Sequence, residues 1–429
     1  MLAIGVSGAM LSMRLALREQ SSVDRLLLQE GGDSNRGGAV ASAIVPRGFG
    51  YGDIPLRSAF FLSIWLLSFG ALAAPNDVAT LDRSTWPEQL SNPTLFDVAS
   101  RAEILTFARA LLDSEAWDEA SLKQRLGLRI INMTSIEAVR QRLWRQLLSN
   151  YNFAQQSCDQ DASFCFLVED MDTLREQAGK FQLGDDSYYA RWAEPSRAFH
   201  EQYLDELLRK AALFPQSASE IERFGDYERN GDELNDRLFL LTFDSAANLA
   251  PDNTPWLTEY LRKSNMNGTF FVLGSELQSR LEQRSVASLQ ALYSQQCVGV
   301  QGWEYRSHSH WQDWQDSIER SVELAKGKLP ENYVPLFRPP YGQRRADAQA
   351  FFNAQGLQVA LWDIDPQDGA GKLKGEQSGQ RVLTLMLLWR HGVINFNARQ
   401  DAVKTALPWL LTQTAQSGIG WEDCQDAFR

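Results

Sequence analysis

The sequence lacks an excess of positive charge. Its 429 residues carry 42 Lys and Arg against 54 Asp and Glu, which gives a formal net charge of −12. Nucleic-acid binding depends on clustered Lys and Arg that neutralise phosphates, so no nucleic-acid partner is expected. With 44% hydrophobic and 11% aromatic residues, a chain of this length has enough apolar side chains for two or three globular domains.

Long apolar runs are also scarce. The longest, SAFFLSIWLLSFGALA at residues 58–73, follows Arg57 and ends in a small-x-small pattern at residues 71–73. It is shorter than the roughly 20 residues that a spanning helix needs, so no stable membrane anchor is expected. Its features are typical of a secretory signal peptide. We therefore expect residues 58–73 to be a signal peptide and the protein to be periplasmic or secreted, with residues 1–57 as a non-native or disordered extension.

Cysteine is sparse, and its spacing does not favour zinc. The chain has Cys158, Cys165, Cys297 and Cys424, with no Cys-x-x-Cys spacing and no His beside either member of the close pair. An even number of cysteines in an exported protein favours two disulfides. Cys158 with Cys165 is the pair that the sequence indicates more directly.

The first half of the exported part has a helical pattern. Residues 74–230 are expected to form a helical domain, in which Thr134 and Glu137 form a capping box at the start of one helix. The apolar residues that follow recur on one helical face, at Ile136, Val139, Leu143 and Leu147. The polar stretch 226–236 contains an Asn-Gly turn signal and is interpreted as a linker.

The pattern changes after this stretch. Short β-rich runs alternate with amphipathic segments, as at Leu238–Phe243, Thr269–Leu273 and Val359–Trp362. Such alternation is typical of a parallel-sheet or barrel domain of the α/β class. We expect this domain over residues 237–412, followed by a C-terminal tail over residues 413–429.

Four motifs lie in this second part. They are LTFDSA at 241–246, GTFFVLG at 268–274, FRPPYG at 337–342 and WDIDPQD at 362–368. In order and spacing they resemble the TFDDG, ATFFVxG, FRPPYG and WDxDxxD motifs of the polysaccharide deacetylases, also called the NodB homology domain or carbohydrate esterase family 4. Any one could arise by chance, but four in order over about 130 residues make a specific match.

This resemblance implies a fold and a reaction. The fold is an irregular (β/α) barrel, and the reaction removes N-acetyl or O-acetyl groups from a glycan. In the family, one Asp and two His hold a divalent metal that polarises the acyl carbonyl and its water. Another Asp is the general base, and a His protonates the leaving amine. The implied partner is an N-acetylated polysaccharide or a peptidoglycan-type glycan.

Part of the family's catalytic set is present. By the resemblance, Asp244 matches the general base and Arg338 matches the residue that orients it. Asp365 or Asp368 matches the acid that tunes the catalytic histidine. A structural interpretation of Asp244 and Arg338 stands beside this one, as a buried ion pair kept for folding.

The remaining positions depart from the family. Ser245 replaces the metal-binding Asp, and Gln301 and Tyr305 replace the two histidine ligands when residues 299–305, GVQGWEY, are aligned with G-[NS]-H-x-x-x-H. Asn397 replaces the catalytic acid, and an amide cannot give up a proton at neutral pH. These neutral donors are poor ligands for a zinc-like ion, so no metal cofactor and weak or absent catalysis are expected.

Three functional hypotheses follow. The first is a glycan-binding pseudoenzyme whose substrate groove contains Ser245, Gln301, Tyr305, Tyr341, Trp362 and Asn397. The second is an active metal-dependent deacetylase with a rearranged site at His308 and His310, which would share one face of a strand. The third is an interaction protein that works through its helical domain.

Overall fold

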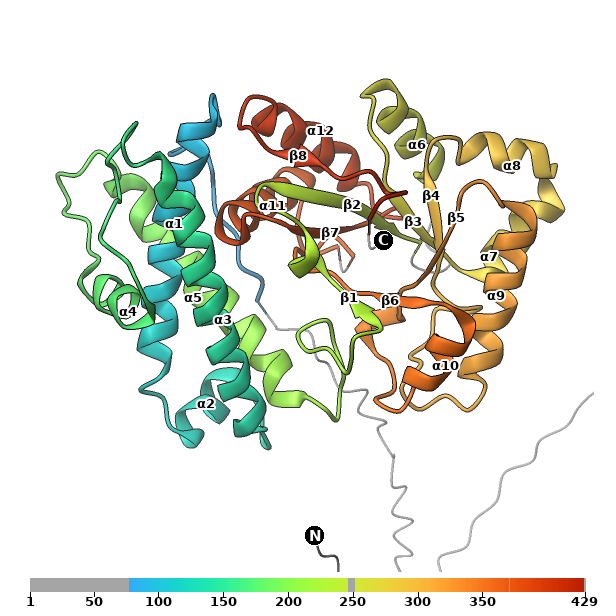
Figure 1. Cartoon of the computed structure of the whole chain (residues 1–429), viewed down its shortest axis with the longest axis horizontal. Coiled ribbons are helices and arrows are strands. Elements are labelled where there is room, and N and C mark those ends of the chain that lie inside the picture. The colour runs from blue at the N-terminus through green and yellow to red at the C-terminus, as the bar shows by residue number, and fades with distance from the viewer. Residues whose placement is uncertain (1–76, 246–250, 370, 428–429) are drawn as a thin grey trace, which may run out of the picture. The chain divides into compact units, whose positions relative to one another are not determined.

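The computed structural model describes residues 77–427, apart from residues 246–250 and residue 370 (Figure 1). The expected extension at 1–57 and the expected signal peptide at 58–73 lie outside these residues. Over the described ranges, no helix combines the length and the hydropathy that crossing a membrane requires.

The first part of the described chain is helical. Its helices are α1 (Pro93–Ser114), α2 (Glu119–Leu126), α3 (Met133–Ala154), α4 (Met171–Lys180) and α5 (Ala190–Leu213). Helix α1 is buried along most of its length and contacts α3, α4 and α5. The expected capping box of Thr134 and Glu137 is wrong, because α3 starts earlier: Asn132 is its N-cap and accepts a hydrogen bond from the N–H of Ser135.

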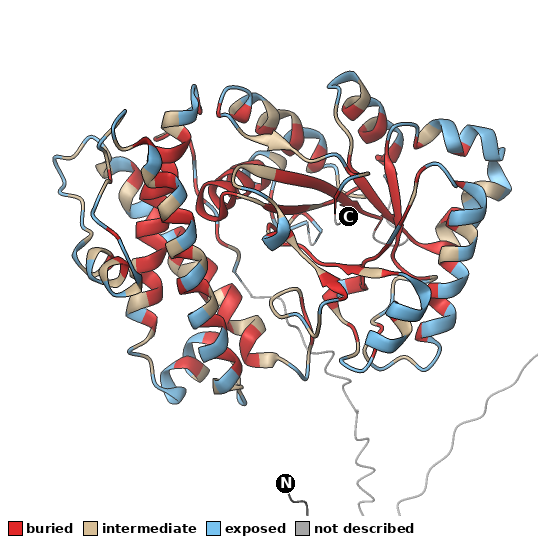
Figure 2. Ribbon diagram, in the orientation of Figure 1, coloured by how far each residue is buried: buried red, intermediate tan, exposed pale blue. Residues whose placement is uncertain are grey.

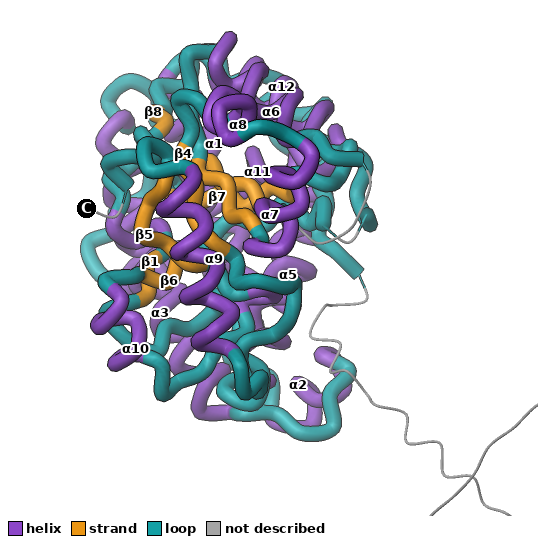
Figure 3. The backbone as a smooth tube through the Cα atoms, turned by 90° about the vertical axis from the view of Figure 1, so that its right-hand side faces the viewer, coloured by secondary structure: helices purple, strands orange, loops and turns teal. Residues whose placement is uncertain are grey.

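The second part is a parallel sheet with helices around it (Figure 3). Its strands are β1 (Glu228–Arg229), β2 (Leu238–Asp244), β3 (Thr269–Val272), β4 (Cys297–Val300), β5 (Tyr333–Phe337), β6 (Gln358–Ala360), β7 (Gly392–Asn397) and β8 (Gly420–Trp421). The strand order is β1-β6-β5-β4-β3-β2-β7, with β8 also paired to β2, and the paired strands are parallel. The helices between them are α6 (Thr254–Lys263), α7 (Gly274–Gln283), α8 (Val286–Leu292), α9 (Trp314–Lys328), α10 (Gln349–Gln355), α11 (Gly375–Trp389) and α12 (Val403–Thr414).

A short segment after β6 closes the sheet into a barrel. The N–H groups of Asp363 and Ile364 both lie 3.1 Å from the backbone oxygen of Val393, and the N–H of Asn395 donates to Ile364. The Asp363 carboxylate accepts from the N–H groups of Gly231 (2.7 Å) and Val393 (2.8 Å). A few bonds thus replace a full strand pair between β6 and β7. The predicted irregular (β/α) barrel, preceded by a helical region, is confirmed.

Both ends of the barrel extend beyond the ranges expected from the sequence. Residues 226–236, expected as a linker, contain strand β1 and the 3₁₀ turn η2 (Gly231–Glu233). Residues 413–429, expected as a tail, contain β8, which pairs with β2. Strands of two residues are too short to show the alternation that identifies a strand in a sequence.

Two disulfides are present. The pair Cys158–Cys165, expected from the sequence, is confirmed, and Cys297 at the start of β4 is bonded to Cys424. The second disulfide joins positions 127 residues apart and holds the C-terminal segment against the barrel.

Helix α11 belongs to the core of both parts. Its residues from Ser378 to Trp389 are buried, and it contacts α1 and α3 as well as β7 and α12 (Figure 2). The Ser100 hydroxyl of α1 donates to the backbone oxygen of Leu387 (2.7 Å), and Glu206 of α5 forms a buried ion pair with Arg381 (2.7 Å). One continuous hydrophobic cluster spans the helical region and the barrel.

We predict that the Cys297–Cys424 disulfide contributes more stability than the Cys158–Cys165 disulfide. A crosslink restricts the unfolded chain more strongly when it closes a longer loop, and here the separations are 127 and 7 residues. Replacing Cys297 and Cys424 by Ala should lower the free energy of unfolding by roughly 2–5 kcal/mol. Chemical denaturation measures this loss, with the Cys158→Ala/Cys165→Ala variant as the matched comparison. Equal losses in the two variants would contradict the prediction.

Candidate functional site

The carboxyl ends of several barrel strands meet at one polar site, here called the strand-end site. Asp244 is the last residue of β2 and Asn397 is the last residue of β7, and the two are register partners. Gln301 follows β4 directly, and Arg338 follows β5 directly. Parallel strands of a barrel place their carboxyl ends at one rim, so side chains far apart in the sequence are brought together.

Arg338 lies at the centre of this site and is fully buried. Its Nη1 donates to Thr242 Oγ1 (2.7 Å), Asp244 Oδ1 (3.2 Å) and Asn395 Oδ1 (2.8 Å). Its Nε donates to the backbone oxygen of Ala360, the last residue of β6 (3.1 Å), and its Nη2 donates to that of Leu361, the next residue (3.3 Å). The structure thus brings Asp244 and Arg338 together as an ion pair, and the same guanidinium connects the ends of β2, β6 and β7.

Asp244 is buried beside this guanidinium. Its Oδ2 accepts a hydrogen bond from Asn395 Nδ2 (3.2 Å). Burial raises the pKa of the Asp244 carboxyl above its usual value, while the nearby Arg338 charge and the Asn395 amide oppose the rise. A carboxylate with a raised pKa is a better proton acceptor than one in open water.

Neutral side chains occupy the positions that the sequence resemblance assigns to metal ligands. Ser245 Oγ accepts a hydrogen bond from the N–H of Leu273 (3.2 Å). Gln301 is fully buried, and its amide is near enough to Asp244 to lower the pKa of that carboxyl. Neither amide atom of Gln301 meets the geometry of a hydrogen bond with a described residue, and the same holds for Trp362 Nε1. An unpaired buried polar group costs about 1–3 kcal/mol.

Two tyrosines contact each other at this site. The rings of Tyr305 and Tyr341 meet edge to face, with centroids 4.7 Å apart. Burial raises the pKa of Tyr305, and the Asp244 charge raises it further, so its phenol stays neutral at physiological pH. Tyr341 is 55% exposed and has a left-handed backbone with φ of 60°. This conformation costs a non-glycine residue roughly 1–2 kcal/mol, and such strain is common at functional sites.

The two acids after β6 have different surroundings. Asp368 is buried, and its Oδ2 accepts from the backbone N–H of Asn397 (3.0 Å). Burial raises the pKa of Asp368 to about 8, against the effect of that hydrogen bond and with a further rise from Asp365. The Asp365 carboxylate instead accepts from the backbone and side-chain nitrogens of Gln367, at 2.8 and 2.9 Å. Asp368, rather than Asp365, therefore contacts Asn397, the position that the resemblance assigns to the catalytic acid.

The histidines of the alternative metal site have separate environments. His308 is buried against the rings of Trp311 and Phe337, and its Nε2 lies 3.2 Å from Ser317 Oγ. Burial lowers the pKa of His308 to about 4. His310 is exposed, and neither histidine is on a strand. The expectation that the two share a strand face is therefore wrong, because this segment is an irregular loop.

The donor set does not fit a zinc-like ion. Across residues 77–245, 251–369 and 371–427, no three His, Cys, Asp or Glu side chains are grouped so that they could hold a metal. A hydroxyl, an amide and a phenol stand at the expected ligand positions, whereas zinc prefers thiolate, imidazole and carboxylate.

Some residues of the site were not identified from the sequence. Thr242 and Asn395 are two positions before Asp244 and Asn397 on their strands, so the two-residue period of a strand places each pair on one face. That signal could have identified both residues.

The sequence also did not identify Lys210 of α5, which forms an ion pair with Glu220. Burial lowers the pKa of Lys210, but the nearby carboxylates of Glu220 and Asp365 raise it.

A cavity of about 550 Å³ lies between the helical region and this side of the barrel. Trp362, Asp365 and Lys210 are among the residues that line it, whereas Asp244 and Gln301 are not. The helical region therefore contributes side chains next to the strand-end site.

The fold and this site define a (β/α) barrel of polysaccharide deacetylase type. Residues 231–360 match the family model described as polysaccharide deacetylase. This region of the chain is therefore a polysaccharide deacetylase domain, as the motifs indicate.

The chain is similar to parts of known proteins. The peptidoglycan-N-acetylmuramic acid deacetylase PdaC of Bacillus subtilis (strain 168) is 29% identical over 206 residues, which are 46% of this chain and 40% of that protein. The bifunctional xylanase/xylan deacetylase of Cellvibrio japonicus is 33% identical over 141 residues, or 30% of this chain and 19% of that protein. The chain thus spans less than half the length of either relative. Among solved structures, a CE4 family pseudoenzyme from Bacillus anthracis aligns with a TM-score of 0.39 and 17% identity, covering 45% of this chain and 65% of that one.

We predict that Asp368 makes the stability of the protein depend on pH. The pKa of Asp368 is about 8 in the folded protein and about 3.9 in the unfolded chain. The contribution of Asp368 to the free energy of unfolding is therefore fully present below about pH 4 and is lost as the pH rises through about 8. Between these two pH values, the free energy of unfolding falls by up to about 1.4 kcal/mol for each unit by which the pH rises, because of this one group. Asp368→Asn should remove that slope.

Urea denaturation at pH 5 and pH 8 measures the effect. The control is Asp347→Asn, which changes an exposed carboxylate and should keep the slope of the wild type. If Asp368→Asn loses as much stability as the wild type between the two pH values, Asp368 is not protonated in the folded protein.

Proposed function

We propose that this chain is an exported protein that binds an acetylated glycan at the strand-end site and does not catalyse metal-dependent deacetylation. The observation that carries the proposal is the buried amide of Gln301, which lies beside Asp244 although neither of its atoms has the geometry of a well-formed hydrogen bond in the described part of the chain. Buried polar groups in native proteins normally have well-formed hydrogen bonds, so this amide favours a polar ligand at the strand-end site.

An acetamido group has the right chemistry for these residues. It offers one N–H donor and one carbonyl acceptor, and the Gln301 amide offers the complementary acceptor and donors. Asp244 supplies a further acceptor, which Arg338 holds in place. Tyr341, exposed and held by its backbone at the edge of the site, presents an aromatic face for a sugar ring. The names of the two similar deacetylases agree with this ligand class, because their substrates are acetylated polysaccharides.

Hydrolysis lacks the groups that would drive it. A water molecule becomes a good nucleophile near neutral pH when a metal ion lowers its pKa, and the donors at Ser245, Gln301 and Tyr305 do not suit such an ion. Asn397 cannot protonate the leaving amine. The residues that remain can hold and orient an acetylated sugar, which is the function that we assign to them.

Export is supported by the disulfides. Cysteine pairs of this kind persist in oxidising compartments such as the periplasm and the extracellular space. Both pairs in the described part of the chain are oxidised, at Cys158–Cys165 and Cys297–Cys424.

We predict that Tyr341→Gly weakens glycan binding without destabilising the fold. Glycine accepts the left-handed backbone of position 341 without strain, which offsets its greater entropy in the unfolded chain, so the free energy of unfolding should change by less than about 1 kcal/mol. Removing the aromatic ring should lower the affinity for an N-acetylglucosamine tetramer by roughly tenfold, or about 1.4 kcal/mol. Isothermal titration calorimetry measures the affinity, and thermal denaturation checks the fold.

The control for this variant is Tyr188→Gly. Tyr188 is also an exposed tyrosine, but it belongs to the helical region. Tyr188→Gly should leave the affinity for the N-acetylglucosamine tetramer unchanged. Unaltered binding by Tyr341→Gly would exclude Tyr341 from the glycan site, and the absence of binding by the wild type to both chitin-type and peptidoglycan-type oligomers would refute the proposal.

We also predict that the missing metal site can be built by three substitutions. Ser245→Asp, Gln301→His and Tyr305→His together should give about one zinc per chain by elemental analysis, because they place a carboxylate and two imidazoles beside Asp244. The wild type should contain no stoichiometric metal and release no acetate with added zinc, cobalt or nickel. Stoichiometric metal together with acetate release in the wild type would contradict the assignment of a pseudoenzyme.

A further inference from the structure

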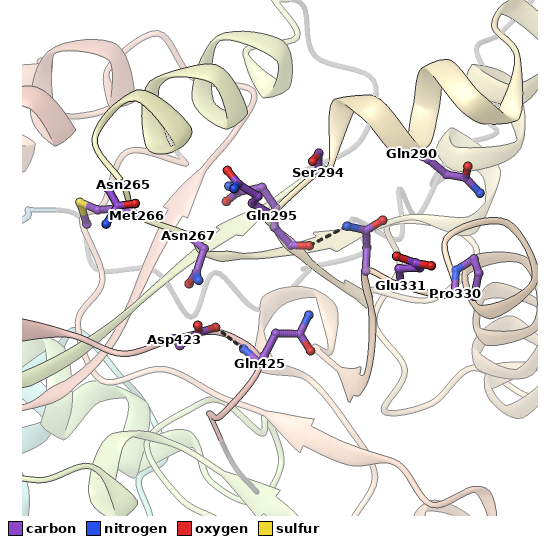
Figure 4. Close-up of a pocket in the computed structure, with 12 residues that line it drawn as sticks. Asn265, Met266, Asn267, Gln290, Ser294, Gln295, Pro330, Glu331, Asp423 and Gln425 are labelled. Carbon is purple, nitrogen blue, oxygen red and sulfur yellow. Dashed lines mark hydrogen bonds between the residues drawn. The ribbon is translucent and has the colours of Figure 1, made fainter.

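A second cavity lies at the other end of the barrel from the strand-end site. It has a volume of about 750 Å³, within the range of small-ligand sites. Its walls come from the segments that enter β3, β4 and β5 and from the C-terminal segment (Figure 4). We call it the amide pocket, and its lining residues are Asn265, Met266, Asn267, Gln290, Ser294, Gln295, Gln296, Pro330, Glu331, Asn332, Asp423 and Gln425.

The lining is polar and carries no positive charge. Seven of its twelve residues are Asn or Gln, and Glu331 and Asp423 are its charged members. Each amide both donates and accepts hydrogen bonds, and a sugar hydroxyl does the same. Phosphates and acidic sugars are disfavoured, because the lining offers them two carboxylates and no Lys or Arg.

One lining residue has an unused hydrogen-bond donor. Gln296 is only 1% exposed, and its Oε1 accepts from the N–H of Gly268 (3.1 Å). Its Nε2 has no hydrogen-bond partner among the described residues. A buried donor without an acceptor is unfavourable, so this group favours a ligand or a water molecule that accepts from it.

The pocket is rigidly built. Asn332 Nδ2 donates to the backbone oxygens of Tyr293 (2.8 Å) and Gln296 (3.0 Å), and Asn267 Oδ1 accepts from the N–H of Cys424 (2.9 Å). The disulfide from Cys424 to Cys297 then ties the C-terminal wall to the start of β4. In Figure 4, Asn267 is on one side of the pocket, Gln290 on the other, and Asp423 and Gln425 lie below them. Walls that are already fixed reduce the entropy lost when a ligand binds.

We infer that the amide pocket is a second saccharide site, which binds a neutral, hydroxyl-rich oligosaccharide through hydrogen bonds. It is separate from the strand-end site and does not depend on the function proposed there. Two sites at opposite ends of one barrel allow a single molecule to hold two glycan strands, or two parts of one strand.

The test compares four proteins by isothermal titration calorimetry with tetramers of N-acetylglucosamine, xylose and galacturonic acid. They are the wild type, Gln290→Ala/Gln425→Ala, Tyr341→Gly and the matched control Gln283→Ala, which removes an exposed Gln of α7 outside the pocket. The double variant should lose roughly tenfold or more in affinity at one site for the neutral tetramers, and Gln283→Ala should lose none. Tyr341→Gly should retain this site. Thermal denaturation checks that each variant is folded.

Each of the other outcomes would contradict either the inference about the amide pocket or the function proposed for the strand-end site. If the double variant binds the neutral tetramers as the wild type does, or if the acidic tetramer binds this site as tightly as the neutral ones, the amide pocket is not a neutral saccharide site. If Tyr341→Gly alone abolishes all binding, the strand-end site is the only binding site and the inference fails. If the double variant alone abolishes it, the amide pocket stands and the function proposed for the strand-end site fails.

Discussion

The buried guanidinium of Arg338 is the constraint on which the rest of the site depends. Each of its nitrogens needs an acceptor, because an uncompensated buried charge costs several kcal/mol. The acceptors come from the ends of β2, β6 and β7, so the strand ends must be in register before Arg338 is satisfied. Asp244 is one of those acceptors. The ion pair with Arg338 gives Asp244 a structural role, and the same geometry keeps a carboxylate at the site for a ligand.

The charged groups at the site partly balance one another. Asp244, Asp365 and Asp368 lie close enough for the first two to raise the pKa of the third. A metal dication would balance such a group of acids. Here one proton on Asp368 and the positive charges of Arg338 and Lys210 reduce the repulsion. Neutral residues at 245, 301, 305 and 397 add no further charge, so the site is suited to a neutral ligand.

The sequence predicts the fold better than it predicts the details of the site. The apolar runs and ordered motifs identify the strands that carry Asp244 and Arg338, and the pairing of these two residues follows from them. The expectation that His308 and His310 share a strand face is wrong because the segment after β4 is an irregular loop, in which His308 is buried and His310 is exposed. Lys210 could not be found from local patterns, because it reaches the site from another part of the chain.

Helix α11 has a consequence for how this protein can change over time. Its side chains from Ser378 to Trp389 are buried, between the barrel on one side and α1 and α3 on the other. A substitution on α11 must suit both neighbours at once, since a core packed on both sides tolerates little change in volume. The helical region and the barrel should therefore diverge in concert, and recombination that exchanged one without the other would leave α11 mismatched.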